Sequence, residues 1–160
     1  MGPMNALDKF DLTILRLLQQ DATFSNAQLS ELVNLSPSQC HRRVKRLEQE
    51  GYIHHYVALL DHRKLGLTVH AVVIIKVRDV SQESKAAFRE QIRHYRLMTE
   101  CWAIAGDKDV ILKIVAPSLE SYSDFLSEKI LSMDNVASAE SYLLLDNMKY
   151  TTEVPIGDHD

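Results

Sequence analysis

The chain has 160 residues and a formal net charge of -4, and its 46 % hydrophobic and 25 % charged residues exclude a wholly disordered protein. A chain of this length buries roughly two thirds of the surface that it exposes when unfolded, so it can form one domain or two small ones. No apolar run approaches the roughly 18 to 20 residues that a membrane span requires, which excludes a spanning helix.

The cysteines and the N-terminus indicate the compartment. Cys40 and Cys101 lie far apart, with no CxxC pair and no His-Cys cluster, so the sequence suggests neither a disulfide framework nor a zinc site. The N-terminus lacks the basic segment and long apolar region of a secretory signal. We therefore expect a soluble cytoplasmic protein in a reducing environment, and we interpret residues 1–3 as a cloning remnant ahead of a natural start at Met4.

Charge is distributed unevenly along the chain. Up to Lys64 there are eight Lys or Arg against seven Asp or Glu, a net charge of +1, and from Leu65 onward there are ten against fifteen, a net charge of -5; together these give -4. The first part also places four cations, Arg42, Arg43, Lys45 and Arg46, within five positions. This asymmetry predicts a locally basic module followed by an acidic one.

The first two predicted helices lie near the N-terminus. Residues 7–20 (LDKFDLTILRLLQQ) favour a helix because Asp8 can cap its free amides and the apolar residues follow helical spacing, with Asp11 as the one polar exception. Residues 25–28 (SNAQ) form a capping box, in which the two end side chains satisfy each other's backbone amides, and therefore begin a second helix.

A third helix follows after a turn at residues 34–35. Residues 36–39 (SPSQ) form another capping box, and Pro37 occupies the first helical position, where its missing N–H costs nothing. The helix is expected to run to Glu50, where Gly51 can supply a left-handed stop. Three helices with a tight turn between the last two predict a helix-turn-helix.

The basic cluster falls on one side of this third helix. At about 100° per residue, Cys40, Val44 and Leu47 form a narrow apolar face that must pack on the first two helices. An arginine side chain can form two hydrogen bonds with guanine, and a glutamine side chain can do so with adenine. A lysine can neutralise the charge of a phosphate, and the free amides at the capped start of the helix can bind one. The residues assigned to DNA contact are Ser36, Ser38, Gln39, His41, Arg42, Lys45, Arg46 and Gln49, with Arg43 at the flank of this face. The alternative is the solvated side of an ordinary surface helix.

The following segment predicts a strand and then a linker. Residues 52–60 (YIHHYVALL) are rich in β-forming residues and read as a strand. His54 and His55 are adjacent and so point to opposite faces of a strand, where they cannot jointly hold a metal without further ligands. Gly66 provides a natural bend in the segment that follows.

The second half of the chain alternates strands and helices. The predicted elements are a buried strand at residues 70–78, a helix after Ser81, a strand at 97–105, a turn at 106–109, a strand at 110–116, a helix at 118–132 and a strand at 137–145. This order, βαββαβ, is that of a ferredoxin-like domain. Residues 151–160 show no periodicity and are expected to form a flexible tail.

The predicted fold class is therefore α+β. It combines an N-terminal (winged) helix-turn-helix domain with a C-terminal ferredoxin-like βαββαβ domain. The expected bounds are residues 4–60 for the first domain, 61–69 for the linker, 70–150 for the second domain and 151–160 for the tail.

A helix-turn-helix that begins LDKFDLTILRLLQQD and continues through LSPSQCHRRVKRLEQEGYI, followed by a βαββαβ domain with a GDKD turn, resembles the Lrp/AsnC family of feast/famine transcription regulators. The resemblance extends from residue 7 to about residue 150. It implies a regulator that binds double-stranded DNA and responds to a small effector, a free amino acid, without a cofactor or metal.

The resemblance also implies an assembly and an effector site. The second domain is expected to pair two protomers across its sheet, the dimers to form an octamer or another assembly, and the effector to bind between dimers near the glycine-aspartate turn. Carried over by position, the effector-binding residues are Ala103, Gly106, Asp107, Lys108, Asp109, Leu119, Tyr142 and Leu143.

Two residues depart from the pattern of that family. Lys108 stands where an aromatic residue is frequent, so a positive charge there can change which effector fits, either by pairing with Asp107 or by favouring an effector with a second anionic group. Asn135 stands where glycine is frequent, and asparagine tolerates a left-handed backbone. GDKD can also be a purely structural hairpin turn, in which the aspartates accept hydrogen bonds from the backbone amides of the turn.

Two other classes of function are possible for a chain with these elements. A ferredoxin-like domain can be a small dimeric enzyme, for which His70, His94 and Trp102 are available, but no catalytic arrangement, metal spacing or phosphate loop is legible. An architectural protein that compacts DNA without an effector is usually strongly positive, because nonspecific affinity comes from counterion release, whereas this chain is acidic. The sequence therefore favours a regulator over an enzyme, and it leaves a combined regulatory and architectural role open.

Overall fold

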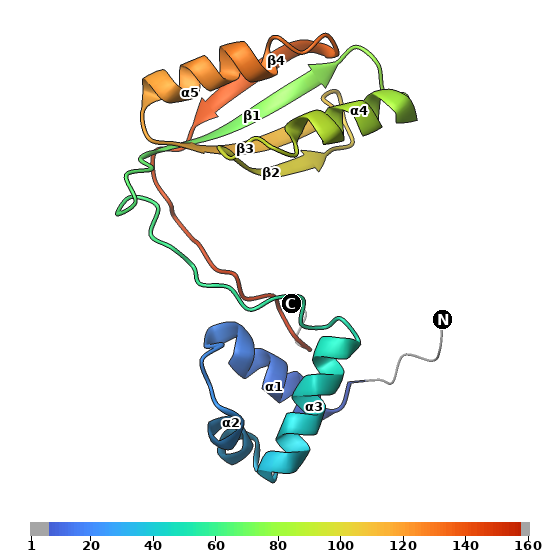
Figure 1. The fold of residues 1–160 in the computed structure, drawn as a ribbon, viewed down its shortest axis with the longest axis vertical. Helices are drawn as coiled ribbons and strands as arrows, with labels where there is room; N and C mark the ends of the chain where they lie inside the picture. Colours follow the sequence, from blue (N-terminus) through green and yellow to red (C-terminus); the bar gives the residue numbers. More distant parts are fainter. Residues whose placement is uncertain (1–6, 158–160) are drawn as a thin grey trace. The chain divides into compact units, whose positions relative to one another are not determined.

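The computed structural model describes residues 7–157, so the predicted start at Met4 and the last three residues of the predicted tail lie outside the described residues. The described chain divides into two compact units, one made of residues 7–59 and 149–157 and the other of residues 60–148. The chain therefore passes between the units twice (Figure 1). Within residues 7–157, none of the helices is long and apolar enough to cross a membrane.

Three helices form the N-terminal unit: α1 (Lys9–Gln20), α2 (Asn26–Val33) and α3 (Pro37–Gln49). Each begins at a capping box, as the sequence predicts for the second and third helices, and the N-cap residues are Asp8, Ser25 and Ser36. In each box the N-cap side chain accepts a hydrogen bond from the amide three residues later, which satisfies a donor that the helix leaves unpaired.

A tight turn and a shared core hold the three helices together. Asn34 ends α2 in a left-handed conformation, with φ of 55°, so that α3 can begin three residues later. The fully buried Ile14 of α1, Cys40 and Leu47 of α3, and nearly buried Leu29 of α2 belong to one apolar cluster. The predicted helix-turn-helix is confirmed, and the predicted apolar face of the third helix is the face that packs on its neighbours.

The predicted strand over residues 52–60 is wrong. The backbone amides of Tyr52 and Ile53 both donate to the carbonyl of Leu47, which closes α3 after the left-handed Gly51, and the chain then runs without strand pairing to residue 60. A β-forming composition is not sufficient for a strand, which also needs a partner, and the described chain offers none there. Tyr56 is anchored to α3 instead, because its hydroxyl donates to the carboxylate of Glu48 at 3.1 Å.

The C-terminal unit has the predicted βαββαβ order. Its elements are β1 (Val69–Val77), α4 (Gln82–Ile92), β2 (Met98–Ala103), β3 (Val110–Ala116), α5 (Leu119–Phe125), the π-helix η1 (Leu126–Ile130) and β4 (Val136–Leu143). The strands form one antiparallel sheet in the order β2-β3-β1-β4. The last predicted helix is therefore not a uniform α-helix, because its second half closes hydrogen bonds of the i to i+5 type, such as that from Leu131 to Leu126 at 2.9 Å.

Only one face of this sheet is covered within the unit. Ala71, Val73 and Ile75 of β1 are fully buried and share a core with Phe88 of α4 and Ile130 of η1, which places both helical elements on the same face (Figure 1). The alternate residues of β1 point the other way and are only partly buried. The opposite face of the sheet is therefore not covered by any helix of this unit.

The tail differs from the expectation of a flexible end. Residues 149–157 belong to the N-terminal unit, where the side-chain amide of Gln19 both accepts from and donates to the backbone of Val154, each at 3.0 Å. The Arg16 guanidinium donates to the carbonyl of Ile156 through Nη2 at 2.7 Å and Nε at 3.2 Å. The tail is thus docked on α1 through backbone groups, which any sequence possesses, and this explains why no side-chain pattern revealed it.

Candidate nucleic-acid interface and effector loop

The start of α3 is fixed by reciprocal side-chain contacts. The Ser36 hydroxyl accepts from the Gln39 amide at 3.3 Å, and the Gln39 side-chain oxygen accepts from the Ser36 amide at 3.3 Å. The Ser38 hydroxyl lies 3.2 Å from that of Ser36. Three of the predicted DNA-contacting side chains therefore cluster at the amino end of α3, where unpaired amides and the positive end of the helix dipole favour a phosphate.

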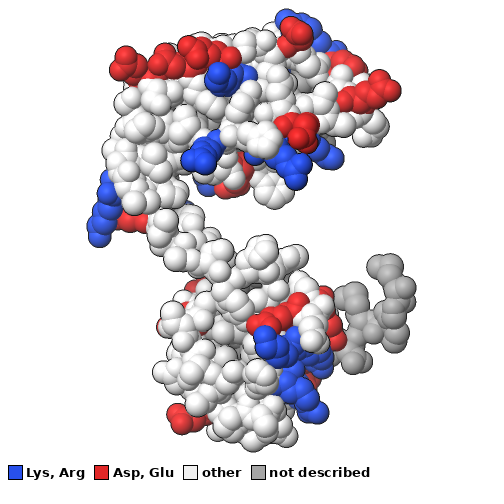
Figure 2. Space-filling model, in the orientation of Figure 1, with Lys and Arg blue, Asp and Glu red and all other residues white. Residues whose placement is uncertain are grey.

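The exposed side of α3 carries four more of the predicted residues. Arg42 and Gln49 are exposed and, within the described chain, take part in neither a hydrogen bond nor an ion pair. Lys45 is 55 % exposed and pairs with Glu48 at 2.7 Å, while His41 lies 3.2 Å from the side-chain nitrogen of Asn26. Figure 2 shows positive side chains gathered over the region of α3 with acidic side chains beside them.

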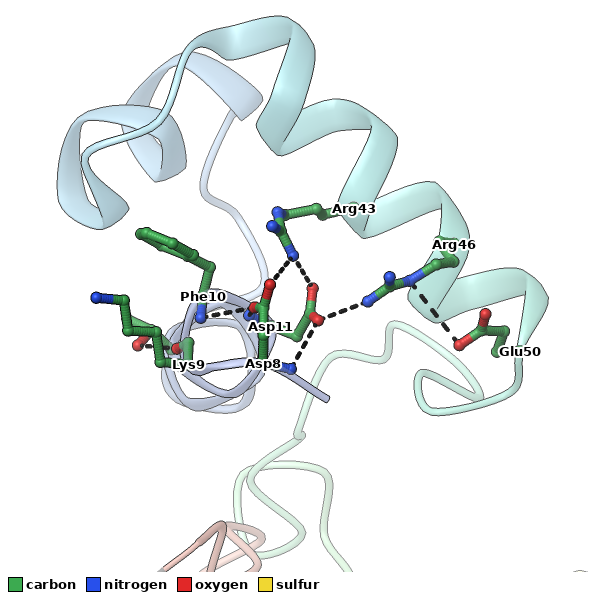
Figure 3. Close-up of polar contacts among 8 residues, drawn as sticks. Asp8, Lys9, Phe10, Asp11, Arg43, Arg46 and Glu50 are labelled. Carbon is green, nitrogen blue, oxygen red and sulfur yellow. Dashed lines mark hydrogen bonds and ion pairs between the residues drawn. The ribbon is translucent and has the colours of Figure 1, made fainter. Parts of the chain in front are cut away.

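The remaining two arginines of the basic cluster face α1 rather than solvent (Figure 3). Arg43 Nη1 lies 2.8 Å from Asp11 Oδ1 and 2.8 Å from Asp8 Oδ2, and Arg46 Nη2 donates to Asp11 Oδ2 at 2.5 Å. Arg46 Nε lies 3.9 Å from Glu50 and has no hydrogen-bond partner in the described chain. The sequence placed Arg46 on the DNA-facing side, but the structure turns its guanidinium onto the first helix.

Asp11 is the centre of this cluster. Its side chain is 1 % exposed, and both carboxylate oxygens accept charge-assisted hydrogen bonds, while Oδ2 also accepts the Asp8 amide at 3.1 Å in the capping box. The hydrogen bond to Asp11 raises the pKa of Arg43, and the Asp11 amide, together with Arg43, lowers the pKa of Asp8. A buried carboxylate is costly unless paired, so Asp11 fixes the orientation of both arginines.

Sequence reasoning missed the role of Asp11, although the signal was visible. Asp11 stood out as the one polar residue on the apolar face of the first helix, and such a residue needs a partner when it is buried. The third helix offered cations with a spacing of three residues, which places Arg43 and Arg46 on one side of a helix. The missing step was to match the buried anion with that pair.

The turn at residues 106–109, the predicted effector loop, is tied to the sheet through Asp109. Its carboxylate accepts the Val77 amide at 2.9 Å and lies 3.4 Å from Lys76 Nζ, and its own amide donates to the Ile75 carbonyl. The bond to the Val77 amide lowers the pKa of Asp109, with a further contribution from Lys76. The pairing of β1 with β4 shifts register between Lys76 and Val77, and such a bulge frees an amide from the ladder. Asp109 therefore joins the turn to the end of β1.

Lys108 forms an ion pair with Glu140 rather than with Asp107. Its ammonium contacts the carboxylate of Glu140 on β4, and the pair raises the pKa of Lys108 and lowers that of Glu140. Glu140 also accepts the Tyr142 hydroxyl at 3.1 Å. Within the described residues Asp107 is exposed and makes neither a hydrogen bond nor an ion pair, so it is the loop carboxylate available to a ligand.

The eight predicted effector residues do not meet in one chain. Ala103 and the loop at residues 106–109 lie where β2 ends and β3 begins, whereas Leu119 and Leu143 lie near the other end of the sheet. Six residue steps of β3, from Val110 to Ala116, separate the two ends by about 20 Å at roughly 3.3 Å per residue. Tyr142 links the two groups only through its hydrogen bond with Glu140. A single site can contain both groups only if two copies contribute.

Asn135 also differs from the sequence-based expectation. In the described chain Asn34 is the one non-glycine residue with positive φ, so Asn135 does not adopt the left-handed conformation. Its side chain instead accepts from the Asp79 amide at 2.8 Å and donates to the Asp79 carbonyl at 3.0 Å. Asparagine therefore joins the end of β1 to the start of β4 by side-chain hydrogen bonds.

Comparison with known protein families agrees with both units. A model described as the Lrp/AsnC ligand binding domain matches residues 70–154, and a model described as winged helix-turn-helix DNA-binding matches residues 7–54. The two matches cover the elements that carry the α3 surface and the effector loop.

Relatives match over nearly the whole chain. The transcriptional regulator AzlB of Bacillus subtilis is 35 % identical over 158 residues, which cover 99 % of this chain and 99 % of that protein. The leucine-responsive regulatory protein of Rhizobium meliloti is 34 % identical over 150 residues, covering 94 % and 96 %. A transcriptional regulator of Neisseria meningitidis, crystallised in complex with L-Met, superposes with a TM-score of 0.90 at 33 % identity and covers 95 % of this chain and 98 % of that chain.

Proposed function

The chain belongs to the Lrp/AsnC family of transcriptional regulators, and we propose that it reads an operator through the exposed side of α3 under the control of a free amino acid bound in its C-terminal unit. The observation that carries this proposal is the capped α3, which is held by its apolar face and presents the unpaired Arg42 at the side directed away from the core. An exposed arginine on a rigid helix suits guanine recognition in a major groove.

We assign the individual DNA contacts from the exposure of each side chain. Arg42 and Gln49 are base-reading candidates because their polar groups have no competing partner in the described chain. Lys45 leaves its ion pair with Glu48 and contacts a DNA phosphate instead. Ser36, Ser38, Gln39 and His41 line the amino end of the helix, where a backbone phosphate would meet free amides. Arg46 acts through α1 rather than by reading bases.

The open face of the sheet supports a homodimer. It carries Trp102, which is 62 % exposed, Tyr142, which is 51 % exposed, and the half-buried Ile74 and Ile111 on the two central strands. Such a face covers itself when two copies pair across it, and two copies also supply the two recognition helices that half-sites one helical turn apart require. Dimers then associate further through the effector site.

The separation of the effector residues supports a composite pocket. We assign the loop at residues 106–109 to one copy, where Asp107 accepts the effector ammonium and the backbone around Gly106 approaches the carboxylate. Leu119 and Leu143 of another copy form the wall that selects the side chain. Lys108 is neutralised by Glu140, so the site favours an apolar amino acid over one with a second anionic group.

Calorimetric titration of the full chain with each of the twenty amino acids tests the effector assignment. An apolar amino acid should bind, and Asp107→Asn should weaken its binding at least tenfold, whereas Asp124→Asn, a matched change of an exposed carboxylate on α5, should leave it unchanged. Absence of binding to every amino acid would favour the effector-independent architectural alternative. Equal weakening by the two substitutions would remove Asp107 from the site.

We also propose that the chain is a non-catalytic regulator that works in the cytoplasm. The matched relatives are transcriptional regulators, and a regulator acts where the chromosome is accessible. Within the described residues no group of three or more His, Cys, Asp or Glu side chains could hold a metal ion. On this proposal, the activity that a variant can change is DNA binding.

A further inference from the structure

The four cations of the basic cluster fall into two classes. Arg42 is unpaired in the described chain and Lys45 is 55 % exposed, whereas Arg43 is 20 % and Arg46 32 % exposed. The two shielded guanidinium groups lie among three carboxylates, those of Asp8, Asp11 and Glu50 (Figure 3). With two positive and three negative charges, this cluster contributes no positive charge to the surface that meets DNA.

We propose that Asp11 is a specificity-determining positioning residue, which withholds Arg43 and Arg46 from the DNA backbone and thereby limits binding to nonspecific DNA. This inference rests on the proposed DNA-binding role of α3. Asp11 itself is 1 % exposed and does not reach the DNA, so it acts only through the two arginines. Phe10 supports the same arrangement, because its ring lies 5.4 Å from the Arg43 guanidinium.

The physical argument is the difference between nonspecific and specific affinity. Nonspecific affinity depends on the number of phosphates that the protein neutralises, whereas base reading depends on placed hydrogen bonds. Each phosphate contact contributes about 0.9 to the slope of log K against log salt, which corresponds to about 3.5-fold between about 50 and 200 mM. Two released arginines would therefore steepen the slope by about 1.8 for each recognition helix. The loss of nonspecific affinity between about 50 and 200 mM salt would then be about twelvefold greater than in the parent.

Asp11→Asn is the informative substitution because asparagine keeps the shape of the side chain and can still accept the Asp8 amide of the capping box. It lacks the buried charge that both arginines share, so Arg43 keeps only the exposed Asp8 and Arg46 only Glu50 at 3.9 Å as anionic partners. A purely structural role for Asp11 predicts lower thermal stability and an unchanged salt slope for the protein that remains folded. A specificity role predicts a steeper slope and tighter binding to random DNA at low salt.

The test measures binding of a fluorescently labelled random-sequence duplex by anisotropy across a salt series, with folding checked by circular dichroism. Asp11→Asn should steepen the slope by about 0.9 to 1.8 per recognition helix. Adding Arg43→Gln and Arg46→Gln to this variant should return the slope to that of the parent. Arg46→Gln alone, in which Asp11 keeps Arg43 as its partner, should leave the slope unchanged.

Arg42→Gln is the matched control on the same helix. On the random duplex, which lacks the matching base, the exposed Arg42 contacts a phosphate instead, so this substitution should flatten the slope by about 0.9. Were Arg46→Gln to flatten the slope as much as Arg42→Gln does, Arg46 would contact phosphate in the parent and the proposal would fail, whether or not Asp11→Asn folds. An unchanged slope in folded Asp11→Asn would also overturn it. If Arg42→Gln changes nothing either, the failure lies in the proposed DNA-binding surface rather than in the role of Asp11.

A duplex enriched from a random pool by the parent protein measures specificity. Between about 200 and 50 mM salt, the ratio of its affinity to that of the random duplex should fall about threefold to twelvefold further in Asp11→Asn than in the parent. The released arginines contact phosphates of the random duplex, whereas on the enriched duplex the base contacts fix α3 in the register of the parent complex. An unchanged ratio together with a steeper slope would show that the released arginines serve specific and nonspecific DNA alike, which contradicts the proposal.

Discussion

The docking of the C-terminal tail on α1 makes a specific prediction for Gln19→Ala. The Gln19 side chain forms two hydrogen bonds with the Val154 backbone, each at 3.0 Å, and Arg16 holds Ile156. Neutral hydrogen bonds stabilise a fold by about 1 kcal/mol each, and one with a charged donor by about 1.5 to 3 kcal/mol. These three hydrogen bonds therefore contribute about 3.5 to 5 kcal/mol in favour of docking.

Ordering the tail opposes these contacts. Fixing the backbone of residues 151–157 costs conformational entropy, which opposes the hydrogen bonds and the burial of the partly buried Ile156. The net free energy of docking is therefore small. Gln19→Ala removes about 2 kcal/mol of it, so we expect the tail to leave α1 while the three-helix core stays folded.

Amide hydrogen exchange measures this directly, because the Val154 amide is the group that donates to Gln19. Its exchange should accelerate at least tenfold in Gln19→Ala, since each 1.4 kcal/mol corresponds to about a factor of ten. The melting temperature should fall by only a few degrees. Gln20→Ala, one position along the same helix and exposed, is the matched control and should leave exchange at Val154 unchanged. Equal exchange at Val154 in the two variants would refute the reasoning.

Three further changes probe the core, the loop and the sheet. Leu47→Ala, at a fully buried position of α3, should destabilise the N-terminal unit by about 2 to 5 kcal/mol in chemical denaturation, whereas Leu32→Ala, at a 52 % exposed position, should cost far less. Asp109→Ala should lower the stability of the fold at pH 7. Because the pKa of Asp109 is lower in the folded state, the stability that its carboxylate contributes is complete above about pH 4 and is lost as pH falls through the folded pKa. Thermal melts of parent and variant across this pH range measure that loss. Ile74→Lys on the open sheet face should convert a dimer to monomers in light scattering, whereas Leu131→Lys, at an exposed position on the helix side, should leave the dimer intact.

Local signals allowed much of the fold to be predicted. Ser25 and Ser36, with glutamine three residues later, marked the starts of α2 and α3, and the spacing of Cys40, Val44 and Leu47 gave the buried face of α3. The alternation of strand and helix patterns gave the order of the C-terminal elements. These features depend on residues that are near one another in sequence, so a single sequence contains the information.

The features that were missed depend on partners distant in sequence. Residues 52–60 have the composition of a strand but no partner in the described chain, and the tail binds Gln19 through its backbone, at a separation of 135 residues. Lys108 forms an ion pair with Glu140 of β4. This pair could be predicted only if the register of β4 against β1 were known. The proposed composite effector pocket combines residues of two copies, so the pattern of a single sequence does not reveal which residues meet.

The most direct test of the account compares Arg42→Ala with the parent on two duplexes, one enriched from a random pool by the parent and one with the same bases scrambled. The account predicts that the parent prefers the enriched duplex at least tenfold and that Arg42→Ala loses about 1 to 3 kcal/mol on that duplex and less on the scrambled one. Arg96→Ala, an exposed arginine of the C-terminal unit, should bind as the parent does. A parent protein without preference, or an Arg42→Ala variant that keeps the full preference, would contradict the claim that α3 reads the operator.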